Sequence, residues 1–104
     1  MKDSNFLKEN NARQLWHPMT SPKDSIDHPP KIITGAGGVS ITDIDGHTVV
    51  DGVGGLWNVN LGFSCQPVKD AIAAQLDVLP YYSTFRGTSN DQVIQLAEVL
   101  KDFF

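Results

Sequence analysis

The sequence predicts an α+β fragment made of an N-terminal helix, a three-stranded antiparallel meander and two amphipathic helices. Its 104 residues match the usual size of one domain, and 40% of them are hydrophobic. Short β-prone runs separated by glycine-containing turns occupy residues 31–51. Apolar residues recur at helical spacing in residues 67–79 and 90–104. We divide the chain into a helix with a proline-rich connector, 1–30, and the meander with its two helices, 31–104.

The first thirty residues are predicted to hold one helix and no other regular element. Residues 3–15 favour a short helix capped by Asp3 or Ser4. Residues 16–30 contain four of the six prolines in the chain. Because each proline disfavours the helical conformation of the residue before it, we expect an extended connector.

The meander is predicted from alternating strands and turns. Strands are expected at residues 31–34, 39–44 and 47–51, with a glycine-rich turn at 35–38 and an Asp-Gly hairpin turn at 45–46. Residues 56–62 are predicted to form a loop with a short strand, since glycines at 52, 54 and 55 permit unusual backbone angles.

Two helices follow the meander. Pro67 suits a first helical turn, and the apolar residues up to 79 lie on one face. The second helix is expected to begin near Asn90, with Ser89 and Gln92 as a capping box. No stop signal follows its last apolar residue, so the chain is interpreted as truncated. Few elements are available to cover the large apolar side chains, which include Trp16, Trp57, Phe63, Phe85 and Phe104.

Composition excludes several classes of function. Eight basic and twelve acidic residues give a net charge of −4 without a basic stripe, so no nucleic-acid partner is expected. No apolar run is long enough to cross a membrane, and with one cysteine, Cys65, and no signal peptide we expect a cytoplasmic protein. The glycine runs lack the spacing of phosphate-binding loops, and the histidines and Cys65 lack the paired spacing of a zinc site.

Two aromatic segments remain as candidates for function. One is the run GGLW at 54–57, and the other is YYSTFRG at 81–87. Such rings can be core or interface anchors. They can equally form a pocket wall, in which Arg86 would bind a carboxylate.

These segments carry a resemblance to a known family. Residues 13–104 resemble the N-terminal segment of class III (omega) aminotransferases, which are pyridoxal-phosphate enzymes of fold type I. The matching strings are LWHPMT at 15–20, ITGAGGVSITDIDGHTVVDGVGGLWNVNLGF at 33–63, PVKDAIAAQL at 67–76 and YYSTFRGTSN at 81–90. The family's meander pattern of glycines and aspartates is found between Gly38 and Gly52.

The resemblance implies roles for five residues in substrate binding. Leu56 and Trp57 match a pair that lines the substrate entrance and small pocket. Phe85 matches an aromatic that reaches the active site of the neighbouring subunit, and Arg86 lies close to positions that recognise carboxylates in some relatives. Met19 stands where relatives often place an aromatic near the substrate.

No catalytic residue is expected in this chain. The family's Schiff-base lysine and its other pyridoxal-phosphate contacts lie beyond residue 104. None of the lysines here matches the lysine motif of the family: Lys2, Lys8, Lys23, Lys31, Lys69 and Lys101.

By this resemblance, the chain is the N-terminal fragment of a homodimeric transaminase with active sites at the subunit interface. The complete enzyme would move an amino group from an omega-amino acid, an amine or a taurine-like donor to pyruvate, whereas the 104-residue chain alone would be inactive. Two alternatives stay open. LWHPMTS also resembles the start of the diaminopelargonic acid aminotransferase of biotin synthesis. A stand-alone binding module would instead use Trp57 and the tyrosine-containing loop as an apolar patch.

Overall fold

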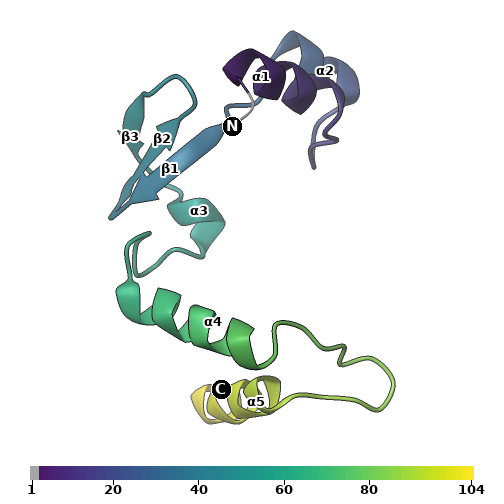
Figure 1. Ribbon diagram of the computed structural model, residues 1–104, viewed down its shortest axis with the longest axis vertical. Helices are drawn as coiled ribbons and strands as arrows, with labels where there is room; N and C mark the ends of the chain where they lie inside the picture. Colours follow the sequence, from purple (N-terminus) through teal and green to yellow (C-terminus); the bar gives the residue numbers. More distant parts are fainter. Residues whose placement is uncertain (1–2) are drawn as a thin grey trace. The chain divides into compact units, whose positions relative to one another are not determined.

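The computed structural model describes residues 3–104, which divide into two compact units at Cys65 and Gln66 (Figure 1). The first unit contains α1 (Ser4–Arg13), α2 (Pro22–Asp27), β1 (Ile33–Gly37), β2 (Ser40–Asp43), β3 (Thr48–Val50) and α3 (Gly54–Trp57), and the second contains α4 (Gln66–Val78) and α5 (Asp91–Phe103). The predicted α+β class is confirmed. Within residues 3–104, no helix has the length and apolar character needed to cross a membrane. The division at residue 30 stays a prediction.

Helix α1 begins at the predicted cap. The carboxylate of Asp3 accepts a hydrogen bond from the Asn5 amide at 2.7 Å. The helix ends at Arg13, two residues before the predicted end. An ion pair of 2.5 Å joins Lys8 to Asp45 in the β2–β3 turn. Because both side chains are well exposed, this pair contributes at most about 1 kcal/mol.

The connector contains a helix, so the prediction of no regular element there is wrong. Ser21 caps α2, and its hydroxyl oxygen accepts from the Asp24 amide at 3.1 Å. Pro22 stands at the first helical position, where proline is favoured because its missing N–H would have no partner in the helix. A proline inside a helix would break it, but at this first position Pro22 favours the start of the helix.

The three strands form an antiparallel sheet in the order β1-β2-β3, which confirms the meander. The turn predicted at 35–38 is wrong in extent. Gly35 pairs with Thr42, and Gly37 pairs with Ser40, so the glycine run is mostly strand. Only residues 38 and 39 turn, and Gly38 takes a φ of +56° that suits the first position of a tight hairpin turn.

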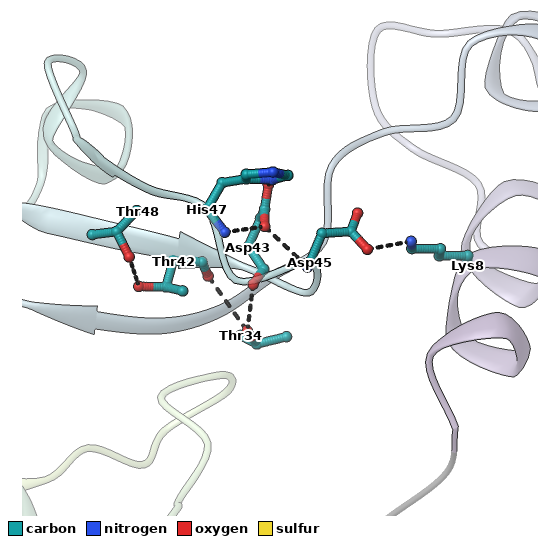
Figure 2. Close-up of polar contacts among 7 residues, drawn as sticks. All are labelled: Lys8, Thr34, Thr42, Asp43, Asp45, His47 and Thr48. Carbon is teal, nitrogen blue, oxygen red and sulfur yellow. Dashed lines mark hydrogen bonds and ion pairs between the residues drawn. The ribbon is translucent and has the colours of Figure 1, made fainter.

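Threonine hydroxyls make contacts between neighbouring strands (Figure 2). The Thr34 hydroxyl donates to the carbonyl oxygen of Asp43 at 3.2 Å, next to the point where the β1–β2 register shifts. The hydroxyls of Thr42 and Thr48 lie 2.8 Å apart across β2 and β3. These hydrogen bonds of specific side chains help to fix the register of the sheet, which no buried apolar face does within residues 33–50.

The turn between β2 and β3 is organised by one carboxylate. Asp43 accepts hydrogen bonds from the amides of Asp45 and His47 at 3.0 and 2.9 Å, and its second oxygen lies 3.1 Å from the His47 ring nitrogen (Figure 2). The hydrogen bond from the His47 amide is the largest cause that lowers the pKa of Asp43. Gly46 completes the turn at a φ of +87°.

The second unit holds the two predicted helices. Their bounds agree with the sequence pattern to within a few residues, but the capping box is wrong. Asn90 is the N-cap of α5, and its side-chain oxygen accepts from the Val93 amide at 3.0 Å. Gln92 is therefore at the second helical position, one short of the position from which a capping-box side chain reaches back.

None of the apolar side chains of residues 3–104 is buried, and the buried residue in this range is Ser25. Trp16, Trp57, Phe85 and Phe104 are all more than three quarters exposed, while Phe63 is half-buried. The expectation of uncovered apolar faces is confirmed for these four side chains. The regular structure described above is therefore held by backbone ladders, caps and turns.

Candidate functional site

The segment after the sheet forms a left-handed turn instead of the predicted loop with a short strand. All four residues of α3 have positive φ, from 58° at Gly54 to 75° at Leu56. The Trp57 amide donates to the Val53 carbonyl at 2.9 Å, and the Asn58 amide donates to the Gly54 carbonyl at 3.1 Å. This is the hydrogen-bond spacing of one α-helical turn, wound in the opposite hand.

The left-handed turn is costly at its two non-glycine positions. For an L-residue this conformation costs about 1–2 kcal/mol, so Leu56 and Trp57 are both strained. Gly55 has no room for a side chain, since an added Cβ would lie 2.6 Å from Cγ2 of Val59. Strain of this kind persists only where the surrounding structure imposes it, and it concentrates at functional sites.

Asp51 supplies hydrogen bonds that hold this turn. One carboxylate oxygen accepts from the Val53 amide at 3.1 Å, and the other accepts from the Gly55 amide at 2.7 Å. The Asp51 carbonyl also accepts from the Gly54 amide at 3.3 Å, so three successive amides point to one residue. The Asp51 amide in turn donates to the Val39 carbonyl at 2.9 Å, which connects α3 to the sheet.

The chain after α3 returns to the β1–β2 turn. The Phe63 amide donates to the Gly38 carbonyl at 2.8 Å, and the Gly38 amide donates to the Ser64 hydroxyl at 2.8 Å. Gly62 lies so close that an added Cβ would be 2.8 Å from the Gly38 carbonyl oxygen. The segment that carries Leu56 and Trp57 is thus fixed to the sheet at both of its ends.

The loop between α4 and α5 brings together the other aromatic candidate and its arginine. The Arg86 guanidinium carbon lies 5.7 Å from the centre of the Phe85 ring, within the range of a cation–π contact. The Phe85 amide donates to the Ser83 hydroxyl, and the Thr88 hydroxyl donates to the Ser83 carbonyl at 2.6 Å. These bonds give the loop a local fold although its rings are exposed.

The five predicted substrate residues are placed as follows. Met19, Leu56 and Trp57 belong to the first unit, whereas Phe85 and Arg86 belong to the second. The structure pairs Leu56 with Trp57 on one turn and Phe85 with Arg86 in one loop. Their assignment to a substrate site stays a prediction.

Four of the five candidates share an unusual backbone conformation. Within residues 3–104, the non-glycine residues with positive φ are Met19, Leu56, Trp57 and Arg86, which are four of the five candidates. All four side chains are exposed, so packing against a core does not explain the strain.

The lysines that the structure describes do not fit a covalent pyridoxal-phosphate site. Lys8 is paired with Asp45 and Lys101 with Glu98, and the remaining described lysines, Lys23, Lys31 and Lys69, are exposed. An aldehyde-binding lysine has to be desolvated or held beside another cation to be reactive near neutral pH. Lys2 lies outside the described residues, which also show no group of three side chains suited to a metal ion.

Sequence reasoning missed Asp51, which it treated only as part of the meander pattern. The local signal is the aspartate that opens the glycine-rich run DGVGG, two residues before Val53, whose amide it binds. Aspartates in such positions accept hydrogen bonds from the following backbone. That pattern predicts a turn, but the left-handed conformation of Leu56 and Trp57 could not be predicted from it, because those residue types disfavour positive φ.

Comparison with known proteins agrees with the fold and with the family resemblance. The family described as aminotransferase class-III matches residues 22–104. A thermostable (S)-enantioselective omega-transaminase from Thermomicrobium roseum aligns with a TM-score of 0.86 and 27% identity, covering 100% of this chain and 23% of that one. An amine transaminase from an uncultivated Pseudomonas species, solved in its PLP-bound form, is 49% identical with a TM-score of 0.74, covering 88% of this chain and 20% of that one.

The names of the curated relatives indicate different amino donors and acceptors. The diaminobutyrate–2-oxoglutarate transaminase of Halomonas elongata is 36% identical over 88% of this chain and 20% of its own length. The putrescine–pyruvate aminotransferase of Pseudomonas aeruginosa is 35% identical over 82% of this chain and 19% of its own. The adenosylmethionine-8-amino-7-oxononanoate aminotransferase of Geobacter sulfurreducens is 32% identical over 96% and 22%. The chain spans about a fifth of the length of these relatives.

Proposed function

This chain belongs to the class III aminotransferases, and on that premise we propose that the whole protein transfers an amino group from an omega-amino acid, an amine or a taurine-like donor to pyruvate. The likeness to a putrescine–pyruvate aminotransferase supports this choice of substrates, as does that to an amine transaminase. Since the chain covers a fifth of such proteins, the activity is proposed for the full-length protein.

The observation that carries the proposal is the strained backbone of the predicted substrate residues Met19, Leu56, Trp57 and Arg86, together with their exposure. In the left-handed turn Trp57 is 82% exposed next to Leu56, so its ring is available as an apolar wall for the carbon chain of a donor. Arg86 provides a cation whose fork of N–H groups matches a carboxylate. Met19 and Phe85 are proposed to add further apolar surface for the substrate.

The cofactor of the family is pyridoxal phosphate, which supplies the electron sink for reactions at the carbon that bears the donor's amino group. The lysines described here do not fit its covalent attachment, so we assign to this chain only the binding and orientation of the donor. The proposal includes a cytoplasmic homodimer with active sites at the subunit interface.

The full-length protein, supplied with pyridoxal phosphate, tests this function directly. Putrescine, β-alanine, taurine and a benzylic amine are each paired with pyruvate and, separately, with 2-oxoglutarate. We expect alanine from at least one donor with pyruvate and less glutamate with 2-oxoglutarate. Glutamate as the main product would move the protein toward the diaminobutyrate–2-oxoglutarate type of relative.

A second candidate is the diaminopelargonic acid aminotransferase reaction, favoured by the 32% identity to the Geobacter sulfurreducens relative. By its name, that relative acts on adenosylmethionine and 8-amino-7-oxononanoate. Turnover of 8-amino-7-oxononanoate with adenosylmethionine, but not of amines with pyruvate, would replace our first proposal with this one.

The 104-residue chain by itself is predicted to be inactive. It is expressed alone and assayed with pyridoxal phosphate and the same donors, with the full-length protein as the positive control. We expect no alanine above the rate of pyridoxal phosphate free in solution. Turnover by the short chain above that rate would contradict the prediction, since one of its own lysines would then be reactive toward the cofactor.

A further inference from the structure

We infer that Asp51 is a positioning residue that sets the location of the Trp57 ring, and through it the enzyme's discrimination between bulky and small amino donors. This inference rests on the proposed function for its kinetic consequence. Its structural part, that the Asp51 carboxylate holds the left-handed turn α3, stands on the hydrogen bonds of this chain alone.

The turn needs an external support because its own side chains provide none. Leu56 and Trp57 are 70% and 82% exposed, so no packing holds them in the strained left-handed conformation. Beside the backbone hydrogen bonds of the turn, the side-chain support is polar and comes from Asp51, whose two carboxylate oxygens accept from the amides of Val53 and Gly55. A carboxylate that accepts two backbone amides forms stronger bonds than a neutral side chain would.

Asp51 is also hydrogen-bonded to the sheet, so it can hold the turn in a fixed position relative to the strands. Its amide donates to the Val39 carbonyl, directly after the last residue of β3, Val50. The next amides along the chain point back to its own side chain and carbonyl. The residue therefore joins the hydrogen-bonded ladder of the sheet to the turn that carries Trp57.

Asp51→Asn is the informative variant, because it keeps the size of the side chain but replaces one acceptor oxygen with an NH₂ group. One of the two backbone amides, that of Val53 or that of Gly55, then faces the NH₂ group and loses its hydrogen-bond acceptor. Asp45→Asn is the matched control, since Asp45 lies in the same meander and its carboxylate contacts Lys8 rather than α3.

The first measurement is hydrogen exchange by mass spectrometry on the full-length protein. In Asp51→Asn we expect faster exchange in the peptide covering residues 52–61 than in the wild type, and no change there in Asp45→Asn. Unchanged exchange in Asp51→Asn would overturn the inference. This readout needs no turnover, so it decides the structural part even if the wild type transaminates none of the donors and the proposed function fails.

The second measurement is the ratio of kcat/KM for a bulky benzylic amine to that for putrescine, with pyruvate as acceptor. We expect Asp51→Asn to change this ratio roughly threefold to tenfold, below the hundredfold that a misplacement of about 1 Å can cost. A merely structural role would lower both activities together and leave the ratio unchanged.

A double-mutant cycle shows whether Asp51 acts through Trp57. In a Trp57→Ala background we expect Asp51→Asn to leave the donor ratio unchanged, because the ring that it positions is gone. A change of the same size in both backgrounds would overturn the inference. If Asp51→Asn fails to fold, Asp51→Ser replaces it, since its hydroxyl can still accept one amide. Failure of both to fold would also overturn the inference, because Asp51 would then be needed for the fold rather than for the turn.

Discussion

Asp43 shows how a single side chain sets local structure where no apolar core is available. Its carboxylate accepts two backbone amides in the β2–β3 turn and approaches the His47 ring (Figure 2). These hydrogen bonds favour the ionised form, and the bond from the His47 amide is the main reason why the pKa of Asp43 is lowered. The turn is therefore linked to pH through this group.

We predict that Asp43 contributes to stability at neutral pH and loses that contribution in acid. Because its pKa in the folded state is lowered, the contribution is complete above its ordinary pKa of about 3.9 and is lost as the pH falls through the lower, folded value. Thermal unfolding of full-length wild type and Asp43→Asn should give a Tm difference that narrows from about pH 6 to about pH 3. A difference that widens in acid would contradict this link.

Gly62 and Gly38 offer a matched pair of substitutions, since both have positive φ and face each other in the structure. Gly62→Ala adds a methyl group 2.8 Å from the Gly38 carbonyl oxygen and should cost about 3 kcal/mol from strain and clash together. Gly38→Ala meets open space and should cost only about 1 kcal/mol from its φ of +56°. Urea unfolding of the full-length variants measures both, and equal losses would show that the close approach is not maintained.

At the scale of elements, periodic patterns are enough to predict α4, α5 and the meander. Local chemistry is harder to interpret. Pro22 starts α2, although a run of prolines argues against a helix in the connector. Gly35 and Gly37 lie in β1 because the turn needs only two residues. The left-handed turn α3 depends on acceptors contributed by Asp51, which apolar periodicity does not reveal. Residue spacing does not identify the substrate residues either, because periodicity does not reveal local backbone geometry. They are proposed from the family resemblance.

The N-cap of α5, Asn90, can be tested directly. Asn90→Ala removes the side-chain acceptor of the Val93 amide and should cost about 1 kcal/mol in the free energy of unfolding. Ser89→Ala is the matched control and should change it by less than about 0.5 kcal/mol. Urea unfolding of both full-length variants gives the comparison. A larger loss from Ser89→Ala would restore the capping box that the sequence predicts.

At the scale of the whole molecule, hydrogen bonds and caps specify local structure, but no apolar side chain of residues 3–104 is buried. In residues 3–104, the stripes of α4 and α5 and both tryptophans stay exposed. Burial of apolar area is the dominant favourable contribution to folding, so a chain without a buried apolar core cannot be expected to unfold cooperatively. This argues against the stand-alone binding module, which would need a core of its own in addition to an exposed patch.

We therefore predict that the 104-residue chain, expressed alone, binds the dye ANS strongly and shows no cooperative transition in calorimetry. The full-length protein is the control and should bind little dye, because in it the same stripes would be covered. A sharp calorimetric transition of the short chain, with an enthalpy of about 0.7 kcal/mol per residue near 60 °C, would contradict the prediction. It would show that these residues bury their apolar faces by themselves or against a second copy, and it would revive the binding-module alternative. Sedimentation of the same sample separates those two cases, since only the second depends on protein concentration.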